Sequence, residues 1–256
     1  MPEKFILKIT ESIKKGKLAI FCGAGISYDS GIPTVDKIIP PILDKLGMDK
    51  EEKDKVWNSS LPFEAFMQIL SENSETEDFF ELLEIFKKGI PNTNHIFFAK
   101  LAKAGLLKTI CTTNFDTLIE QAFEKEKLKK NIDYQVFSKE EDFGKIDWND
   151  KIKIIKIHGC ITDKENMVVV MKRVAAQEYS EQRQTIINQI FSIGKHEDVL
   201  IFGYSCSDVF DLTLQIENVG TGKEQKSVLF LEHSFPEKEE FRKTEHVSVQ
   251  ENKNPF

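Results

Sequence analysis

The feature that most constrains this chain is an apolar segment that ends abruptly on a glycine-rich turn. Leu18–Cys22 has the length of a buried strand, and Gly23-Ala24-Gly25-Ile26-Ser27 follows it directly, with Gly31-Ile32-Pro33 shortly after. Glycines at the end of a buried strand let backbone N–H groups approach a ligand closely, and the diphosphate of a dinucleotide is the usual ligand. A tight turn leaving a core strand is the commoner explanation of two such glycines alone. The functional interpretation therefore depends on the rest of the chain.

Other apolar segments of strand length recur along the chain, separated by amphipathic patterns. The expected strands cover 18–22, 107–111, 152–157, 199–202 and 228–231, with a short candidate at 167–170. The expected helices of this part cover 3–15, 91–104, 116–127 and 175–194, and residues 128–150 are charged and predict irregular structure. Strands that alternate with helices predict an α/β fold, a Rossmann-like doubly wound parallel sheet with crossover helices.

Residues 34–105 show no strand pattern. Helices are expected up to a break at Pro40-Pro41, from Pro62 through Leu70, and from Asp78 to Lys87. We therefore expect a helical insertion or cap of about 34–104 beside a core of about 1–33 and 105–245, together forming one dinucleotide-binding domain over 1–256. Because the chain stops on the apolar Asn254-Pro255-Phe256 without a finishing element, we expect an N-terminal part of a longer protein.

Charge and cysteine usage exclude several classes of function. A formal net charge of −7 argues against direct nucleic-acid binding as the main activity. The sequence shows neither a signal sequence nor an apolar run of membrane-spanning length, which predicts no membrane association. The cysteines at 22, 111, 160 and 206 contain no Cys-x-x-Cys pair, so neither a zinc ribbon nor a disulfide framework is expected. A cytoplasmic location, buried cysteines and no metal follow from this pattern.

Polar residues collect where the predicted strands end. The five clusters are Gly23 to Ser27, Thr112 to Asp116, His158-Gly159, Gly203 to Ser205, and Glu232-His233. Because ligands of parallel α/β sheets bind outside the carboxyl ends of the strands, these clusters predict one shared nucleotide site.

Each cluster also has an ordinary structural explanation. Thr113-Asn114 caps a helix in one such interpretation, and His158 is a hydrogen-bonded core histidine in another. Asp208 and Asp211 would complement the dipole at a helix N-terminus. Only the convergence of five strand ends favours a functional site over these alternatives.

Taken together, the motifs resemble those of the sirtuin family over about residues 18–232. Gly23-Ala24-Gly25-Ile26-Ser27 with Gly31-Ile32-Pro33 resembles the first NAD-binding motif, and Pro91-Asn92-x-x-His95 and Thr113-Asn114-Phe115-Asp116 resemble the second and third, with Thr113 where deacylases usually carry Gln. His158-Gly159 resembles the catalytic histidine motif, and Gly203-x-Ser205 resembles the adenosine-side motif.

Two departures from sirtuin deacylases redirect this resemblance. The family's Asp-Phe-Arg loop is replaced by Thr34-Val35-Asp36-Lys37, and no four-cysteine zinc module follows Gly159. The pattern Gly203-Tyr204-Ser205-x-x-Asp208 and the helical block are similar to sirtuin-like NAD-hydrolysing domains of bacterial anti-phage defence proteins. This resemblance implies the effector of an abortive-infection system that forms a homo-oligomer. It also implies a C-terminal sensor region or a phage-derived activator as partner.

We therefore expect hydrolysis of NAD, as substrate, to nicotinamide and ADP-ribose. Nicotinamide leaves as a neutral ring, so the difficulty lies in the oxocarbenium character at the ribose carbon. Asn114 is expected to bind the ribose or a water molecule, and His158 to accept a proton. Backbone N–H groups of the first turn are expected to bind the phosphates, Asp116 the carboxamide and Glu232 the adenosine ribose. The expected NAD-binding residues are Gly23, Ala24, Gly25, Ser27, Pro33, Thr113, Asp116, Gly203, Ser205 and Glu232.

Two alternatives stay open. An NAD-dependent protein deacylase would release nicotinamide only when an acylated peptide is supplied, and the missing zinc module argues against it. A non-catalytic sensor of NAD or ADP-ribose would bind tightly without turnover.

Overall fold

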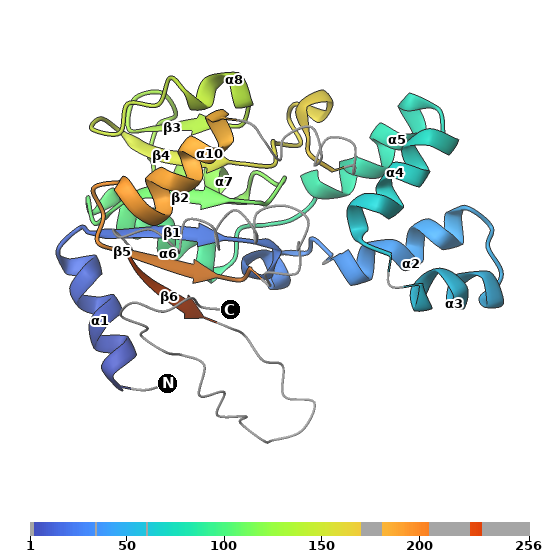
Figure 1. The fold of residues 1–256 in the computed structure, drawn as a ribbon, viewed down its shortest axis with the longest axis horizontal. Helices are drawn as coiled ribbons and strands as arrows, with labels where there is room; N and C mark the ends of the chain where they lie inside the picture. Colours follow the sequence, from blue (N-terminus) through green and yellow to red (C-terminus); the bar gives the residue numbers. More distant parts are fainter. Residues whose placement is uncertain (1–2, 34, 60, 170–180, 205–225, 232–256) are drawn as a thin grey trace.

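The structure, a computed structural model, describes residues 3–33, 35–59, 61–169, 181–204 and 226–231. Within these residues, six parallel strands form one sheet in the order β3-β4-β2-β1-β5-β6 (Figure 1). The strands are β1 (Leu18–Cys22), β2 (Leu107–Thr112), β3 (Tyr134–Phe137), β4 (Ile152–Lys156), β5 (Asp198–Phe202) and β6 (Ser227–Leu231).

The strand order reverses on either side of β1. The chain proceeds from β1 to β2 and beyond on one side, then returns to β5 on the other, so β1 and β5 form the topological switch point. Cys22 pairs with Thr112 and with Phe202, and Thr112 pairs with Lys156, so four carboxyl ends lie level. The predicted doubly wound parallel α/β sheet is confirmed.

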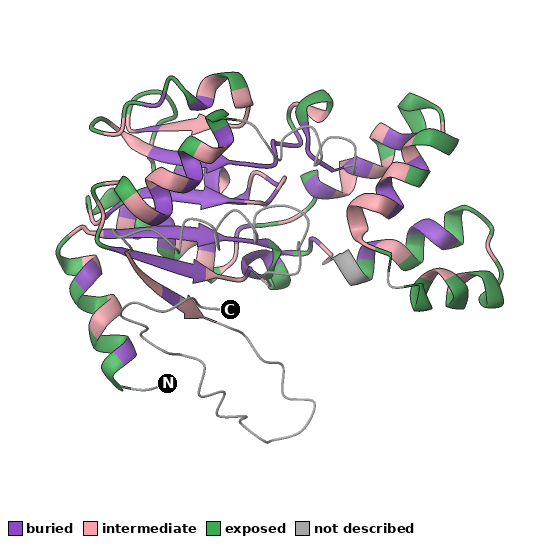
Figure 2. Ribbon diagram, viewed as in Figure 1, coloured by how far each residue is buried: buried purple, intermediate pink, exposed green. Residues whose placement is uncertain are grey.

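Helices cover both faces of the sheet. One face carries α1 (Glu3–Lys14), α6 (Thr93–Lys103) and α7 (Leu118–Lys125), and the other carries α8 (Glu140–Phe143), α10 (Glu181–Asn188) and the π-helix η4 (Gln189–Ile193). Successive residues of β1 alternate between the two layers, with Ile20 in the first core and Phe21 in the second. All five residues of β1 are buried, and Figure 2 shows the central strands buried along their length.

A separate group of helices lies beyond the carboxyl ends of the strands (Figure 1). It comprises α2 (Val35–Lys45), α3 (Lys50–Asn58), α4 (Phe63–Asn73), α5 (Thr76–Leu83) and the 3₁₀ helix η2 (Glu84–Lys87). Its apolar core includes Phe66, Met67 and Leu83, and it extends onto Leu118 and Cys160 from the segments that follow β2 and β4. We call these five helices the helical module. It packs against the edge of the sheet where the predicted site lies.

Three local predictions differ from the structure. Residues 128–150 contain β3 and α8 instead of irregular structure alone, because a four-residue edge strand has too short a pattern to recognise. Residues 167–169 form no strand; they are buried, and Val168 N–H donates to the His158 carbonyl at 2.8 Å. The apolar composition there reflects burial and not pairing, while residue 170 lies outside the described residues.

The third difference is that Pro40 and Pro41 do not break α2, which continues through both of them. Ile38 before the prolines and Ile42 and Leu43 after them are buried in the same apolar core. Packing on both sides of the prolines thus stabilises a helix that local propensity disfavours. The expected helix 175–194 is observed from Glu181 onward, and its first residues lie outside the described part.

Candidate active site

The turn after β1 packs directly against the turn after β5. Gly25 N–H donates to the Gly203 carbonyl at 2.8 Å, and Gly23 N–H donates to the Phe202 carbonyl at 3.3 Å. A Cβ on Gly25 would lie 2.8 Å from Gly203 Cα. Gly203 itself has a φ of +64°, which favours glycine. Glycine is therefore required here because two backbones meet at the switch point.

This packing limits which N–H groups of the turn can bind phosphate. Those of Gly23 and Gly25 are already donated within the protein. Ala24 is the first residue of the 3₁₀ helix η1 (Ala24–Ser30), it is exposed, and its N–H has no acceptor within the part of the chain that the structure describes. The phosphate-binding role of this turn stays a prediction, and Ala24 N–H is the group best placed for it.

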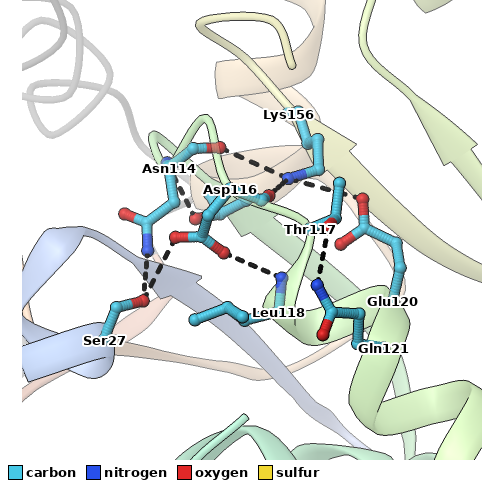
Figure 3. Close-up of polar contacts among 9 residues, drawn as sticks. Ser27, Asn114, Asp116, Thr117, Leu118, Glu120, Gln121 and Lys156 are labelled. Atoms are coloured by element: carbon cyan, nitrogen blue, oxygen red, sulfur yellow. Dashed lines mark hydrogen bonds and ion pairs between the residues drawn. The ribbon is translucent and has the colours of Figure 1, made fainter. Parts of the chain in front are cut away.

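Ser27 is the centre of a buried polar cluster at this edge of the sheet. Its hydroxyl accepts from Asn114 Nδ2 at 3.1 Å and donates to Asp116 Oδ2 at 3.2 Å (Figure 3). The His95 Nε2 atom lies 3.3 Å from the same hydroxyl. All four side chains are at least nine-tenths buried. Residues from three segments far apart in the sequence are thereby joined at one point.

Asn114 has one hydrogen-bonding group that no described residue uses. Its backbone N–H donates to Thr112 Oγ1 at 3.1 Å, and its side-chain Nδ2 donates to Ser27. Its Oδ1 is buried and accepts no hydrogen bond from the described residues. A buried amide oxygen without a donor is energetically unfavourable, so a ligand or water hydroxyl is the natural partner.

Asp116 connects the polar cluster to the next helix. Its Oδ2 accepts from Ser27, and its Oδ1 accepts from the Leu118 N–H at 2.9 Å, in the first turn of α7. A short carboxylate directly before a helix commonly binds a free N–H group in this way. Its expected role toward a carboxamide stays a prediction, since each oxygen keeps a further lone pair.

His95 belongs to the motif Pro91-Asn92-x-x-His95 but was not among the expected site residues. It lies in the first turn of α6, where its Nδ1 is 2.7 Å from the Asn92 Oδ1 atom. Asn92 in turn donates from Nδ2 to the Ile26 carbonyl at 2.8 Å, which ties α6 to η1. Burial lowers the pKa of His95 to about 4, so the imidazole is neutral near pH 7.

A buried ion pair lies behind the cluster and also was not among the expected site residues. Lys156, the last residue of β4, is 1% exposed, and its Nζ is 3.4 Å from Glu120 Oε1 on α7. The same ammonium donates to the backbone carbonyls of Asn114, at 3.4 Å, and Asp116. The available sequence signal was a lysine inside an apolar strand, two residues before His158.

His158 lies on the loop next to the Asn114 loop. Ile157 N–H donates to the Thr112 carbonyl at 3.0 Å, which continues the pairing of β4 with β2 up to this histidine. The His158 ring lies 6.3 Å from the Phe115 ring, and Phe115 lies 5.2 Å from Phe86 of the helical module. Asn114 and His158 therefore occupy neighbouring loops at one edge, as the sequence predicted.

The remaining expected residues divide into three groups. Thr113 is half-buried, and its N–H donates to the Cys22 carbonyl at 3.0 Å. Pro33 is half-buried between η1 and the helical module. Ser205 and Glu232, the two remaining predicted NAD-binding residues, lie outside the described part of the chain. The residues Thr34, Cys206, Asp208, Asp211 and His233, which the sequence analysis names without predicting them to bind NAD, also lie outside it.

Within the described ranges, no cluster of three or more His, Cys, Asp or Glu side chains could hold a metal ion. Cys22, Cys111 and Cys160 are free and buried. Burial raises the pKa of the Cys22 thiol to about 12, which makes a thiolate nucleophile unfavourable there. Among the described helices, none is both long and apolar enough to cross a membrane.

Comparison with known proteins identifies related sequences over most of the chain. A family model described as a SIR2-like domain matches residues 108–250. An NAD(+) hydrolase ThsA of Bacillus cereus (strain MSX-D12) is 25% identical over 209 residues, which cover 80% of this chain and 40% of that protein. An NAD-dependent protein deacetylase of Clostridium acetobutylicum is 33% identical over 115 residues, which cover 44% of this chain and 42% of that protein.

A solved structure described as "Structural Basis for the Mechanism and Regulation of Sir2 Enzymes" is similar to 90% of this chain, with a TM-score of 0.49 and 18% identity, over 85% of that chain. The chain spans about two fifths of the length of the ThsA protein that it matches.

Proposed function

This chain belongs to the SIR2-like domain family, and on that premise we propose that it is an NAD hydrolase that cleaves NAD to nicotinamide and ADP-ribose. Three relatives named NAD(+) hydrolase ThsA support this choice because they match about four fifths of the chain, although a fourth matches 46% of it. The relatives named deacylase or deacetylase match less than half of it.

The observation that carries the proposal is the unused Oδ1 of Asn114. This atom is buried beside Ser27 and Asp116, and no described residue donates to it. Ser27 holds the amide so that its Nδ2 points into the protein, which leaves Oδ1 as the acceptor for a ligand. A ribose hydroxyl or the attacking water has the hydrogen that this acceptor requires.

The proposed reaction needs orientation more than a strong acid. Nicotinamide departs as a neutral ring, and positive charge develops at the ribose carbon. Asn114 would orient the ribose or the water, and His158 on the neighbouring loop would accept the proton that the water or a ribose hydroxyl loses. The carboxylate of Asp116, close to this point, would favour the developing positive charge.

The wider binding site extends this proposal to the remaining predicted residues. Ala24 N–H would bind a phosphate oxygen, and Gly203, Ser205 and Glu232 would contact the adenosine side. Pro33 and Thr113 would line the approach. The same proposal includes a domain made of a sheet core and the helical module, no resident metal, and a cytoplasmic setting.

We also propose a biological role, which the resemblance of the motifs to those of anti-phage defence proteins implies. The chain would be the effector part of a longer anti-phage protein. It would act in a homo-oligomer, with a C-terminal sensor region or a phage-derived activator controlling turnover. Loss of cellular NAD on infection would be the expected consequence.

The test is incubation of the chain, and of the longest natural protein that contains it, with NAD alone while nicotinamide is measured. Asn114→Ala and His158→Ala are each expected to abolish release without unfolding the protein. Asn73→Ala is the control, because that exposed amide binds only the Ile69 carbonyl of its own helix among the described residues.

Three outcomes would contradict the proposal. Unchanged turnover in both variants would reject the assigned residues. Release that requires an acylated peptide would favour the deacylase. Tight NAD binding without release by either protein would favour the sensor.

A further inference from the structure

We propose that Lys156 is a positioning residue for the proposed reaction: its buried ammonium, paired with Glu120, holds the loop that carries Asn114. The inference rests on the proposed function, because the loop matters only if Asn114 acts on NAD. It goes beyond that function in assigning a role to a side chain that does not face the ligand.

The geometry around the Lys156 ammonium satisfies all of its donors. It donates to the backbone carbonyls of Asn114 and Asp116 and forms the ion pair with Glu120 Oε1 (Figure 3). An ammonium has three N–H groups, and these contacts supply three acceptors. Two of the three acceptors, the carbonyls of Asn114 and Asp116, belong to the loop of residues 113–117 between β2 and α7, so the side chain holds that loop in place.

Residues 113–117 need another source of hydrogen bonds because they lie beyond the end of β2. Beyond Thr112 the carbonyls of this segment no longer pair along β2, and a buried carbonyl without a donor is unfavourable. Lys156 pairs with Thr112 in register, so its side chain starts beside the point where the loop begins. The orientation of the Asn114 peptide then determines whether its side chain presents Nδ2 to Ser27 and Oδ1 to the ligand.

The charge balance explains why both partners are needed. Burial alone would lower the pKa of Lys156, but the nearby carboxylates, with Glu120 first, outweigh it and hold that pKa above its ordinary value. Burial raises the pKa of Glu120, and Lys156 offsets only part of that rise. Removing Lys156 alone would therefore leave an unpaired buried carboxylate, and the resulting instability would obscure any effect on the loop.

The double variant Lys156→Met with Glu120→Gln separates the two effects, because it removes both charges together. We expect it to recover most of the stability that Lys156→Met alone loses. Its kcat for nicotinamide release should remain about 10- to 100-fold below wild type, with KM for NAD little changed, since misplacement of a catalytic group lowers kcat. Amide hydrogen exchange should quicken in residues 113–118 and not elsewhere in the sheet.

Lys153→Met is the matched control. Lys153 lies on the same strand and is 2% exposed, but its ammonium donates to the carbonyls of Asp150 and Lys151 near the start of β4. Its replacement should leave both kcat and the exchange of residues 113–118 unchanged.

A double variant with wild-type kcat and wild-type exchange in 113–118 would overturn the inference and leave Lys156 a purely structural residue. If wild-type protein releases no nicotinamide, the proposed function fails instead. The exchange measurement then still decides whether Lys156 holds the loop.

Discussion

Replacement of Ser27 by alanine should destabilise this protein well beyond the loss of one hydroxyl. The Ser27 side chain lies 3.1 Å from Asn114 Nδ2, 3.2 Å from Asp116 Oδ2 and 3.3 Å from His95 Nε2. All of these atoms belong to buried side chains. The alanine variant therefore leaves up to three buried polar groups without this partner, while it removes only a small volume.

The magnitude follows from the cost of an unsatisfied buried group, about 1–3 kcal/mol each. The three costs are not additive, because Asp116 and His95 keep other partners and the cluster can relax. We therefore expect Ser27→Ala to lower the free energy of unfolding by about 3 kcal/mol. Chemical denaturation followed by circular dichroism measures this value.

Ser30→Ala is the matched control on the same 3₁₀ helix. Ser30 is 4% exposed, and its hydroxyl has no hydrogen-bond partner among the described residues. Removing a buried hydroxyl that makes no bond should be neutral or slightly stabilising. The reasoning would be refuted if Ser27→Ala cost less than about 0.5 kcal/mol, the range of an ordinary surface substitution, or if both variants lost the same amount.

Three further predictions follow from the site. Gly25→Ala should lower the melting temperature, because its Cβ would lie 2.8 Å from backbone atoms of Gly203. Gly144→Ala should not lower it, because Gly144 has open space around it and a φ of −68°. Equal effects of the two substitutions would contradict the packing argument. Because burial lowers the pKa of His95 to about 4, the unfolded chain takes up a proton below pH 6.5 that the folded protein does not. Stability should therefore fall as pH drops from 6.5 toward 4, by up to about 1.4 kcal/mol per pH unit, and His95→Gln should flatten the dependence of the urea midpoint between pH 7 and pH 5. Phe86→Leu removes the ring that lies 5.2 Å from the Phe115 ring. It should lower kcat for NAD severalfold and lower the free energy of unfolding by less than about 1.5 kcal/mol. An unchanged kcat would show that the helical module does not influence the candidate active site.

The boundaries of the long elements were predictable because their signals are local. Five of the six strands that the structure describes were expected within one residue at each end, since a short apolar run bounded by glycine, proline or charge is visible in the sequence. β3 was not, because its four residues lie at the sheet edge within a charged segment. The helix break expected at Pro40 and Pro41 was wrong. The local signal was strong there, but the packing of α2 outweighed it.

The candidate site was predictable only in part. The position of Asn114, Asp116 and His158 at strand ends follows from the topology of a parallel sheet. The contacts of His95 and Lys156 with this site could not be predicted. In the sequence His95 is a residue near the start of a helix, and Lys156 is a single charged residue in an apolar strand. Their importance depends on partners that the linear pattern does not reveal.

The amino-acid sequence by itself determined the α/β class and the edge of the sheet at which polar residues gather, because both depend on periodicity and on the direction of parallel strands. Only the tertiary structure decided which of those residues bind one another. Ser27 meets His95 and Asp116 across separations of 68 and 89 positions. Such contacts form only when the strands assemble into one sheet, and the secondary-structure preferences of short segments do not encode them.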